Sequence, residues 1–104
     1  MVAGMAEFTG PVTEIAEIAR IAGEALEGWL RDVDGYLGLV MLTDEGSHTA
    51  RVMTFWESAE AEARSRSTRQ TMREQLAGTA GLDVVDYRVW EVPVWEILAA
   101  APHN

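Results

Sequence analysis

The chain has 104 residues, 48% of them hydrophobic, and a net charge of -9 from 17 acidic residues, eight arginines and no lysine. This length suits one domain with its own core and leaves no room for a second. The acidic balance argues against nucleic acid as a partner, and no apolar run approaches the roughly 20 residues of a membrane span. Because cysteine and a secretory signal are both absent, we expect a soluble cytoplasmic protein.

The first third of the sequence predicts a strand and then a long helix. The segment of residues 2–9 is short and apolar, as in a strand. It is followed by Gly10-Pro11, where proline suits a first helical turn. Apolar residues then recur every three or four positions as far as Trp29, with glutamates on the other side. This pattern predicts an amphipathic helix over residues 11–31.

A hairpin is predicted next. Residues 36–43 read as a strand, which the polar turn 44–47 connects to a second strand that ends at Trp56. A four-residue turn would pair Leu39 with Val52, on the face that also carries Trp56.

A second helix and a last strand complete the prediction. Ser58 is a good N-cap, so a helix should follow over residues 59–77 and stop at Gly78. The last strand is predicted over residues 82–97, and residues 99–104 are predicted to be a loose tail.

The predicted order of strand, helix, strand, strand, helix, strand folds into a ferredoxin-like α+β domain, in which both helices cover one face of a four-stranded antiparallel sheet. This single domain should span residues 1–98. The hairpin strands are apolar on both faces, so the sheet needs a second layer, and we expect a two-fold homodimer that packs sheet on sheet. The end of the last strand should contact the partner, with a bulge near Trp90 and with Pro93 at an edge.

Three sequence features resemble those of a known protein family. They are the approach Asp34-Gly35-Tyr36-Leu37-Gly38-Leu39 to the second strand, the turn Asp44-Glu45-Gly46-Ser47 and the junction Trp56-Glu57-Ser58. With the order of elements, they resemble the antibiotic-biosynthesis-monooxygenase-like family, whose members form dimeric α/β barrels. The resemblance covers nearly the whole chain. The family includes cofactor-independent oxygenases of polyketide tailoring and haem-degrading monooxygenases.

The resemblance implies one site residue. In family members with known chemistry, the tryptophan of this junction lines a pocket between sheet and helices, which implies that role for Trp56. The haem degraders also use an asparagine in the first strand and a haem-ligating histidine on the second helix. Here the only asparagine is Asn104, and Arg66 stands at the histidine's position, so haem degradation is disfavoured. The polyketide oxygenases also rely partly on an asparagine, so the catalytic residues are not identified.

Small polar residues on the second helix suggest a pocket. If Met72 faces the sheet, helical spacing places Ser65 and Thr68 on the same side. Their hydroxyls could bind a ligand beneath Trp56, or they could bond the preceding helical turn while side chains fill the space. We predict a substrate site made of Trp56, Ser65, Thr68, Leu39, Val52 and Met72, with plain core packing as the alternative.

Other ionisable groups are weaker candidates. Arg66, Arg69 and Arg73 form an arginine-rich face that would attract an anion, but a solvated face with Glu62 paired to Arg66 explains it more simply. His48 would suit a general base, yet its place in a polar turn predicts an exposed structural residue. Neither a metal site nor a phosphate-binding glycine loop is predicted.

The leading hypothesis, by resemblance, is a cofactor-independent monooxygenase that acts on a small aromatic or polyketide-like substrate. The substrate would itself supply electrons to oxygen once deprotonated, so the protein need only bind it, orient it and accept a proton. The alternatives are a non-catalytic protein that binds a small hydrophobic metabolite and a structural dimer whose pocket is filled by side chains.

Overall fold

The computed structural model describes residues 1–10 and 15–96. The elements in chain order are β1 (Val2–Thr9), α1 (Ile15–Leu30), β2 (Tyr36–Asp44), β3 (Thr49–Trp56), α2 (Ala59–Ala80) and β4 (Asp83–Glu91). The predicted order is confirmed. The predicted helix start at residue 11 and the predicted tail, residues 99–104, lie outside the described residues.

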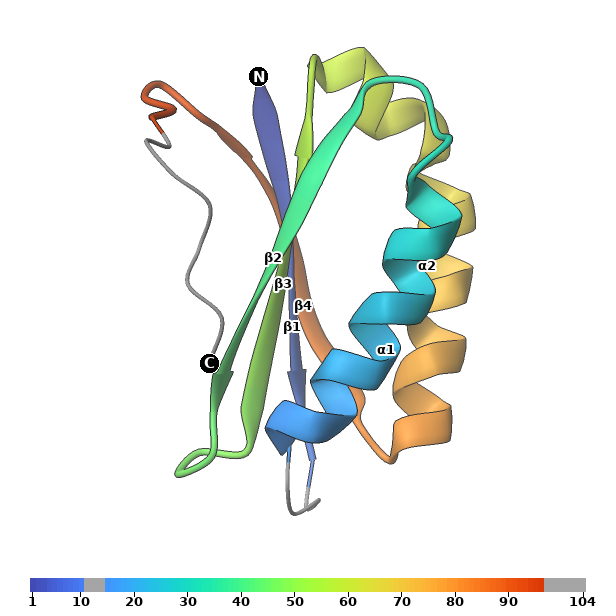
Figure 1. The fold of residues 1–104 in the computed structure, drawn as a ribbon, viewed down its shortest axis with the longest axis vertical. Helices are drawn as coiled ribbons and strands as arrows, with labels where there is room; N and C mark the ends of the chain where they lie inside the picture. Colours follow the sequence, from blue (N-terminus) through green and yellow to red (C-terminus); the bar gives the residue numbers. More distant parts are fainter. Residues whose placement is uncertain (11–14, 97–104) are drawn as a thin grey trace.

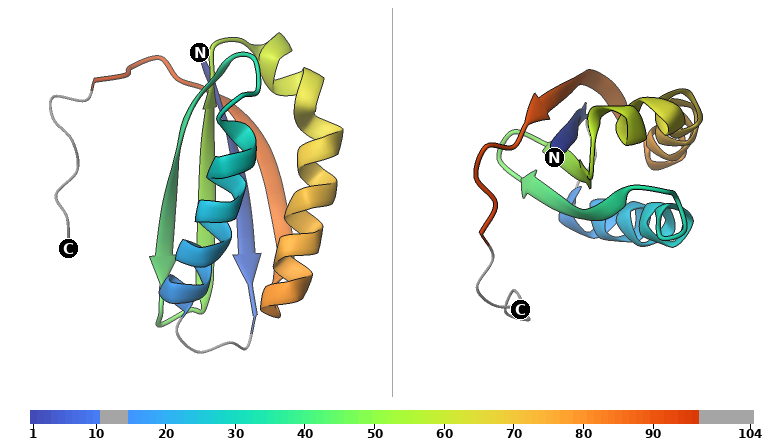
Figure 2. Two further views of the ribbon diagram at one scale, coloured as in Figure 1. Left: turned by 45° about the vertical axis from the view of Figure 1, so that its right-hand side comes forward. Right: turned by 90° about the horizontal axis from the view of Figure 1, so that it is seen from above.

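The molecule has two layers, a sheet and a pair of helices on one of its faces (Figure 1). The four antiparallel strands follow the order β2-β3-β1-β4, so β1 and β3 are central and β2 and β4 are edges. The helix α1 packs chiefly on β2, whereas α2 packs on β4 and β1 (Figure 2). This is the predicted ferredoxin-like α+β fold.

The hairpin register differs from the prediction by two residues. Leu39 pairs with Thr54 rather than with Val52, because the strands extend further toward the turn and Asp44 pairs with Thr49. A shift of two residues leaves the side chains from Leu39 onward on their predicted faces of the sheet. His48 lies in the turn with a φ of 52° and is exposed, as predicted.

Each edge strand contains a register shift in its pairing with its neighbour. In β2, a register shift between Tyr36 and Gly38 lets the Tyr36 ring meet Trp56 on the helix side, with ring centroids 5.6 Å apart. In β4, the shift lies opposite Glu7 and Phe8 and leaves Val85 without a partner residue. The predicted bulge near Trp90 is therefore wrong.

The last strand is also shorter than predicted, because β4 ends at Glu91 instead of continuing to residue 97. Two residues later comes Pro93, which has no backbone N–H to donate to a ladder and also restricts the residue before it.

The helix α2 continues through Gly78, where the sequence predicted its end. It stops at Gly81, whose φ of 77° is left-handed, and the Leu82 N–H then donates to the Ala77 carbonyl over 2.8 Å. This pairing is the usual way in which a left-handed glycine closes a helix. The predicted N-cap is confirmed, since the Ser58 hydroxyl accepts a hydrogen bond from the first turn.

The core lies between the sheet and the helices in two clusters. One includes Phe8, Ile15 and Val52, and the other surrounds Trp56 and Leu30. Among the helices of the described residues, none is both long and apolar enough to cross a membrane.

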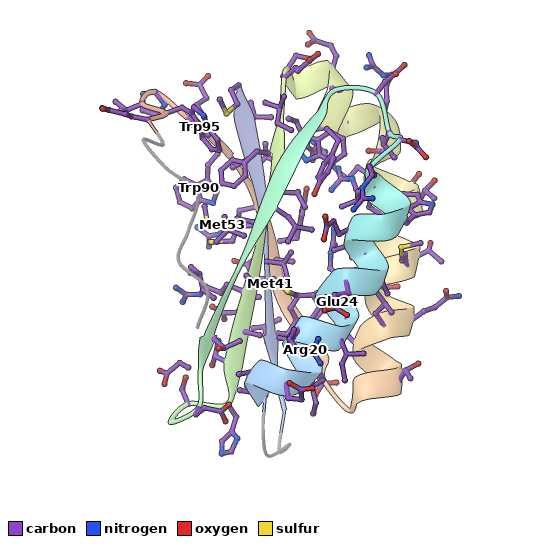
Figure 3. The ribbon with its side chains drawn as sticks, in the orientation of Figure 1. Arg20, Glu24, Met41, Met53, Trp90 and Trp95 are labelled. Atoms are coloured by element: carbon purple, nitrogen blue, oxygen red, sulfur yellow. The ribbon has the colours of Figure 1, made fainter. Side chains whose placement is uncertain are left out.

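Much of the other face of the sheet is apolar and open, and the Glu7–Arg51 ion pair also lies on this face. Trp90 is 49% exposed and Trp95 46% exposed, and both lie with Met53 on the side away from the helices (Figure 3). Val40 and Leu42 of β2 point to this side and are also exposed, because they alternate with residues that face the helices.

Candidate functional site

The helix α2 turns charged residues toward the sheet. Glu62 is fully buried, and Arg69 and Arg73 are only 3% and 9% exposed. The prediction of a solvated arginine face is therefore wrong for these two arginines. It holds for Arg66, which is 48% exposed at its side chain and pairs with Glu62 as predicted, at 2.7 Å from Nε to Oε1.

Tyr87 of β4 contacts two members of this group. Its hydroxyl donates to Glu62 Oε1 over 3.0 Å and accepts from Arg69 Nη1 over 3.1 Å. Arg69 also donates to the Ser65 hydroxyl over 3.0 Å and to the Glu62 carbonyl oxygen over 2.7 Å. The Arg69 guanidinium lies over the Trp56 ring, with Cζ 4.6 Å from the ring centroid. Arg69 is thus fixed by partners on every side.

Arg73 stacks on Tyr87, with its Cζ 4.2 Å from the centre of the ring. We call Glu62, Arg69, Arg73 and Tyr87 the buried polar cluster. Two of its members are cations and one is an anion, so its own balance is positive.

The central strand β1 leaves room for the cluster. A Cβ atom on Gly4 would collide with the Tyr87 hydroxyl oxygen and would lie 3.3 Å from the Thr54 hydroxyl. The Thr54 hydroxyl accepts a hydrogen bond from Trp56 Nε1 over 3.0 Å. Gly4 is therefore needed for the close approach of Tyr87 to β1.

Contacts within the cluster and burial determine the charge states of Glu62 and Tyr87. Burial alone would raise the pKa of the Glu62 carboxyl, but the hydrogen bonds from Arg66 and Tyr87 and the charge of Arg69 hold this pKa below its ordinary value. Burial raises the pKa of the Tyr87 hydroxyl, and the hydrogen bond from Arg69 opposes that rise. At neutral pH, Glu62 is consequently ionised and Tyr87 is neutral.

Two small cavities adjoin the cluster. The first is a space of about 20 Å³, enough for about one water molecule, and its walls include Gly4, Thr54, Arg69, Arg73 and Tyr87. The second is apolar and has about 40 Å³. The two cavities are neighbours, because four residues contribute to the walls of both: Phe8, Leu26, Val52 and Arg73. An aromatic ligand would have to displace some of these side chains, since ligand pockets usually measure about 300 Å³ or more.

The predicted substrate-site residues lie in different places. Val52 lines both cavities. Trp56 is fully buried in the core and lines neither of these two cavities, although Thr54 and Arg69, which it contacts, line the first. Leu39 packs against the core cluster around Trp56.

On α2, the half-buried Ser65 reaches the cluster through Arg69. Met72 is half-buried and lies outside the walls of both cavities, and Thr68 is exposed. The predicted inward orientation of Thr68 is wrong, because the buried face of α2 passes through Arg69 and Arg73 instead.

The members of the cluster on α2 were missed as site residues because ionisable side chains were assigned to solvent. A signal did exist, since Glu62, Ser65, Arg69 and Arg73 recur every three or four positions and so share one helical face. Within residues 1–10 and 15–96, no group of three or more acidic, histidine or cysteine residues is placed to hold a metal ion.

Comparisons with known proteins agree with this architecture. A family model described as antibiotic biosynthesis monooxygenase matches residues 1–75, which include Glu62, Arg69 and Arg73 but not Tyr87. No curated protein matches the chain.

Several solved structures share the fold. SnoaB, a cofactor-independent oxygenase from Streptomyces nogalater, has a TM-score of 0.66 at 13% identity over 95% of this chain and 97% of its own. A monooxygenase from the gene ActVA-Orf6 of Streptomyces coelicolor, in complex with the ligand nanaomycin D, has a TM-score of 0.64 at 21% identity over 95% of this chain and 92% of its own. Rv0793 from Mycobacterium tuberculosis has a TM-score of 0.61 at 15% identity over 92% of this chain and 98% of its own. These similarities show the fold, and the family match over residues 1–75 shows that the chain belongs to the antibiotic biosynthesis monooxygenase family.

Proposed function

We propose that the protein is a monooxygenase that oxidises a small aromatic or polyketide-like substrate without a cofactor. The observation that carries this proposal is Tyr87, which lines a mostly apolar cavity while its hydroxyl is hydrogen-bonded to Glu62 and Arg69. Family membership supports oxygenase chemistry. Two structures with the same fold, a cofactor-independent oxygenase and a monooxygenase with nanaomycin D bound, support the mode of reaction and the kind of ligand.

The reaction we propose converts an activated ring CH2 group to a carbonyl group. The CH2 carbon loses a proton, and the resulting carbanion gives its electrons to O2 to form a peroxide on the same carbon. Loss of the second C–H proton, with cleavage of the O–O bond, leaves C=O and one molecule of water. The two C–H bonds supply all four electrons that O2 accepts, so the substrate is the only reductant.

The cluster suits the first of these steps. Tyr87 can take the substrate proton at its hydroxyl oxygen while its own proton passes to Glu62 along the 3.0 Å hydrogen bond. The low pKa of Glu62 makes it a weak acceptor, so the relay requires a substrate whose anion is stabilised in the cavity. We assign that stabilisation to Arg69 and Arg73, because both arginines line the cavity.

Among the predicted substrate-binding residues, we propose that Val52 contacts the ligand directly. Trp56 and Ser65 support the site by holding Arg69, which each of them contacts. Leu39 and Met72 would reach a ligand only after the side chains that separate the two cavities have moved.

We also propose that the protein works as a homodimer and that the single domain spans residues 1–98. The open apolar face with Trp90, Trp95 and Met53 supports the dimer, because monomers rarely leave such a face in water.

Oxygen uptake with a panel of anthrones and related phenols tests the function. We expect Tyr87→Phe to lower kcat by about 100-fold or more, the usual range for a lost proton-transfer group, with binding retained. Tyr36→Phe is the matched control, because Tyr36 lies against Trp56 outside the walls of both cavities. Binding by the wild type without oxygen uptake would favour the non-catalytic alternative, and no binding at all would favour the structural one.

A further inference from the structure

Arg73 has hydrogen-bonding capacity that the residues described by the structure do not use. It is 9% exposed, and among the described residues its closest interaction is the stack on the Tyr87 ring at 4.2 Å. Within the same residues it takes part in none of the hydrogen bonds or ion pairs that hold Arg66 and Arg69. A guanidinium carries five N–H donors, and burying them without acceptors is unfavourable.

The state of this arginine is consistent with a missing acceptor. Burial lowers the pKa of the Arg73 guanidinium, and the charge of Arg69 lowers it further, while Tyr87, Glu74 and Glu62 do not fully offset these effects. No completely enclosed side-chain nitrogen lacks a partner in the described residues, so the Arg73 nitrogens remain within reach of water or of a ligand.

Arg73 lies where the interior meets a surface groove. It lines both internal cavities, and together with Tyr87 and Arg66 it also lines a groove of about 330 Å³ between α2 and β4. The stacked pair of Arg73 and Tyr87 therefore separates the apolar interior from solvent. A ligand held by Arg73 can place a polar group at this wall and an apolar body inside.

The other charges nearby are already engaged. Arg66 is held by Glu62. At the rim of the groove, Glu74 accepts a hydrogen bond from Gln70, and Asp86 pairs with Arg88. Of the two arginines that line this groove among the described residues, Arg73 is therefore the one with all of its donors left for an outside acceptor.

We propose that the site recognises an aromatic compound that carries a carboxylate, with the carboxylate on Arg73 and the ring body in the apolar cavity, which the ligand enlarges by displacing the side chains between the two cavities. The planar fork of a guanidinium matches the two oxygens of a carboxylate, and the apolar walls provided by Phe8 and Val52 match a ring. The inference rests on the proposed function, since it specifies the class of substrate for the same site.

Isothermal titration with naphthoate and its neutral isostere naphthamide tests this assignment without any turnover. We expect the wild type to bind naphthoate about 10-fold or more tighter than naphthamide, the size of effect typical of a hydrogen bond to a charged group. Arg73→Met should abolish this preference, and Arg73→Lys should keep only part of it, because lysine keeps the charge but not the fork. Arg64→Met is the matched control, since Arg64 is exposed on the same helix and its loss changes the net charge equally.

Equal binding of the two compounds by the wild type would overturn the inference, as would an unchanged preference in Arg73→Met or the failure of both compounds to bind at millimolar concentration. The outcome is separable from that of the proposed function. A preference for naphthoate that depends on Arg73, without oxygen uptake on any substrate, would leave the carboxylate site standing and remove the oxygenase. Turnover of neutral anthrones without such a preference would support the oxygenase and rule out the carboxylate site.

Discussion

The buried carboxylate of Glu62 gives the sharpest test of the cluster. In the folded chain it accepts hydrogen bonds from Arg66 and Tyr87, and the Arg69 guanidinium lies 3.5 Å away. Glu62→Gln keeps the size of the side chain and one acceptor oxygen but removes the charge. Arg69, which is 3% exposed, then has no full counter-charge.

The expected loss of stability follows from the exposure of each partner. Removing one member of a buried ion pair costs about 3–5 kcal/mol. The part of this cost that comes from the Glu62–Arg66 ion pair is reduced by solvent, because the Arg66 side chain is 48% exposed. The glutamine also still accepts one hydrogen bond, which reduces the cost further. We therefore expect a loss of about 2–3 kcal/mol in the free energy of unfolding. In a domain of this size, that loss lowers Tm by roughly 10–20 °C.

Urea denaturation followed by circular dichroism at neutral pH measures this loss. Glu60→Gln is the matched control, since Glu60 also lies in the first turn of α2 but is exposed, so any effect on the helix dipole is shared. If the free energies of unfolding of Glu62→Gln and Glu60→Gln differ by less than about 0.5 kcal/mol, the reasoning on the buried charge is refuted.

The pH dependence has a definite sign. The pKa of Glu62 is lower in the folded than in the unfolded chain, so its ionised form stabilises the fold above the ordinary pKa of a glutamate. That contribution is lost as the pH falls through the lowered value. The stability difference between wild type and Glu62→Gln should therefore be constant near neutral pH and shrink at acidic pH, and a difference that grows on acidification would contradict the assignment.

Three further predictions concern other parts of the structure. Gly4→Ala should displace the Tyr87 hydroxyl, costing about 1–3 kcal/mol in urea denaturation and most of any oxygenase activity, and a fully active variant would contradict the close packing. Gly78→Ala should stabilise the protein by about 0.5–1 kcal/mol because it lies inside α2 with open space around it, whereas Gly81→Ala should cost about 1–2 kcal/mol because of its left-handed φ. Trp90→Glu should convert the proposed dimer to a monomer in sedimentation, and a wild type that is already monomeric would refute the dimer.

The fold could be predicted because its signals are local. Apolar residues alternate in the strands and recur at helical spacing in α1, and Ser58 marks the start of α2 directly. The end of α2 was misplaced because a glycine inside a helix lowers its stability without ending it, and only the backbone conformation distinguishes Gly81 from Gly78.

The candidate site could not be predicted in the same way, because its burial depends on distant partners. Arg69 and Glu62 look like surface residues until Tyr87, 25 positions after Glu62, brings its hydroxyl between them. Trp56 was correctly placed on the helix side of β3 at the start of α2, but its ring is buried behind Thr54 and Arg69 rather than in the wall of the cavity.

The place of β1 between β3 and β4 has a consequence for folding. The pairing of β1 with β4 joins residues as far apart in sequence as Val2 and Glu91, so closing this part of the sheet carries a large entropic cost. Until β4 docks, β1 presents an unpaired edge, and Tyr87 is absent from the cluster. A partly folded form with β4 detached would therefore lack the complete cluster and be prone to aggregate. Hydrogen exchange in β1 should report how often that form is visited.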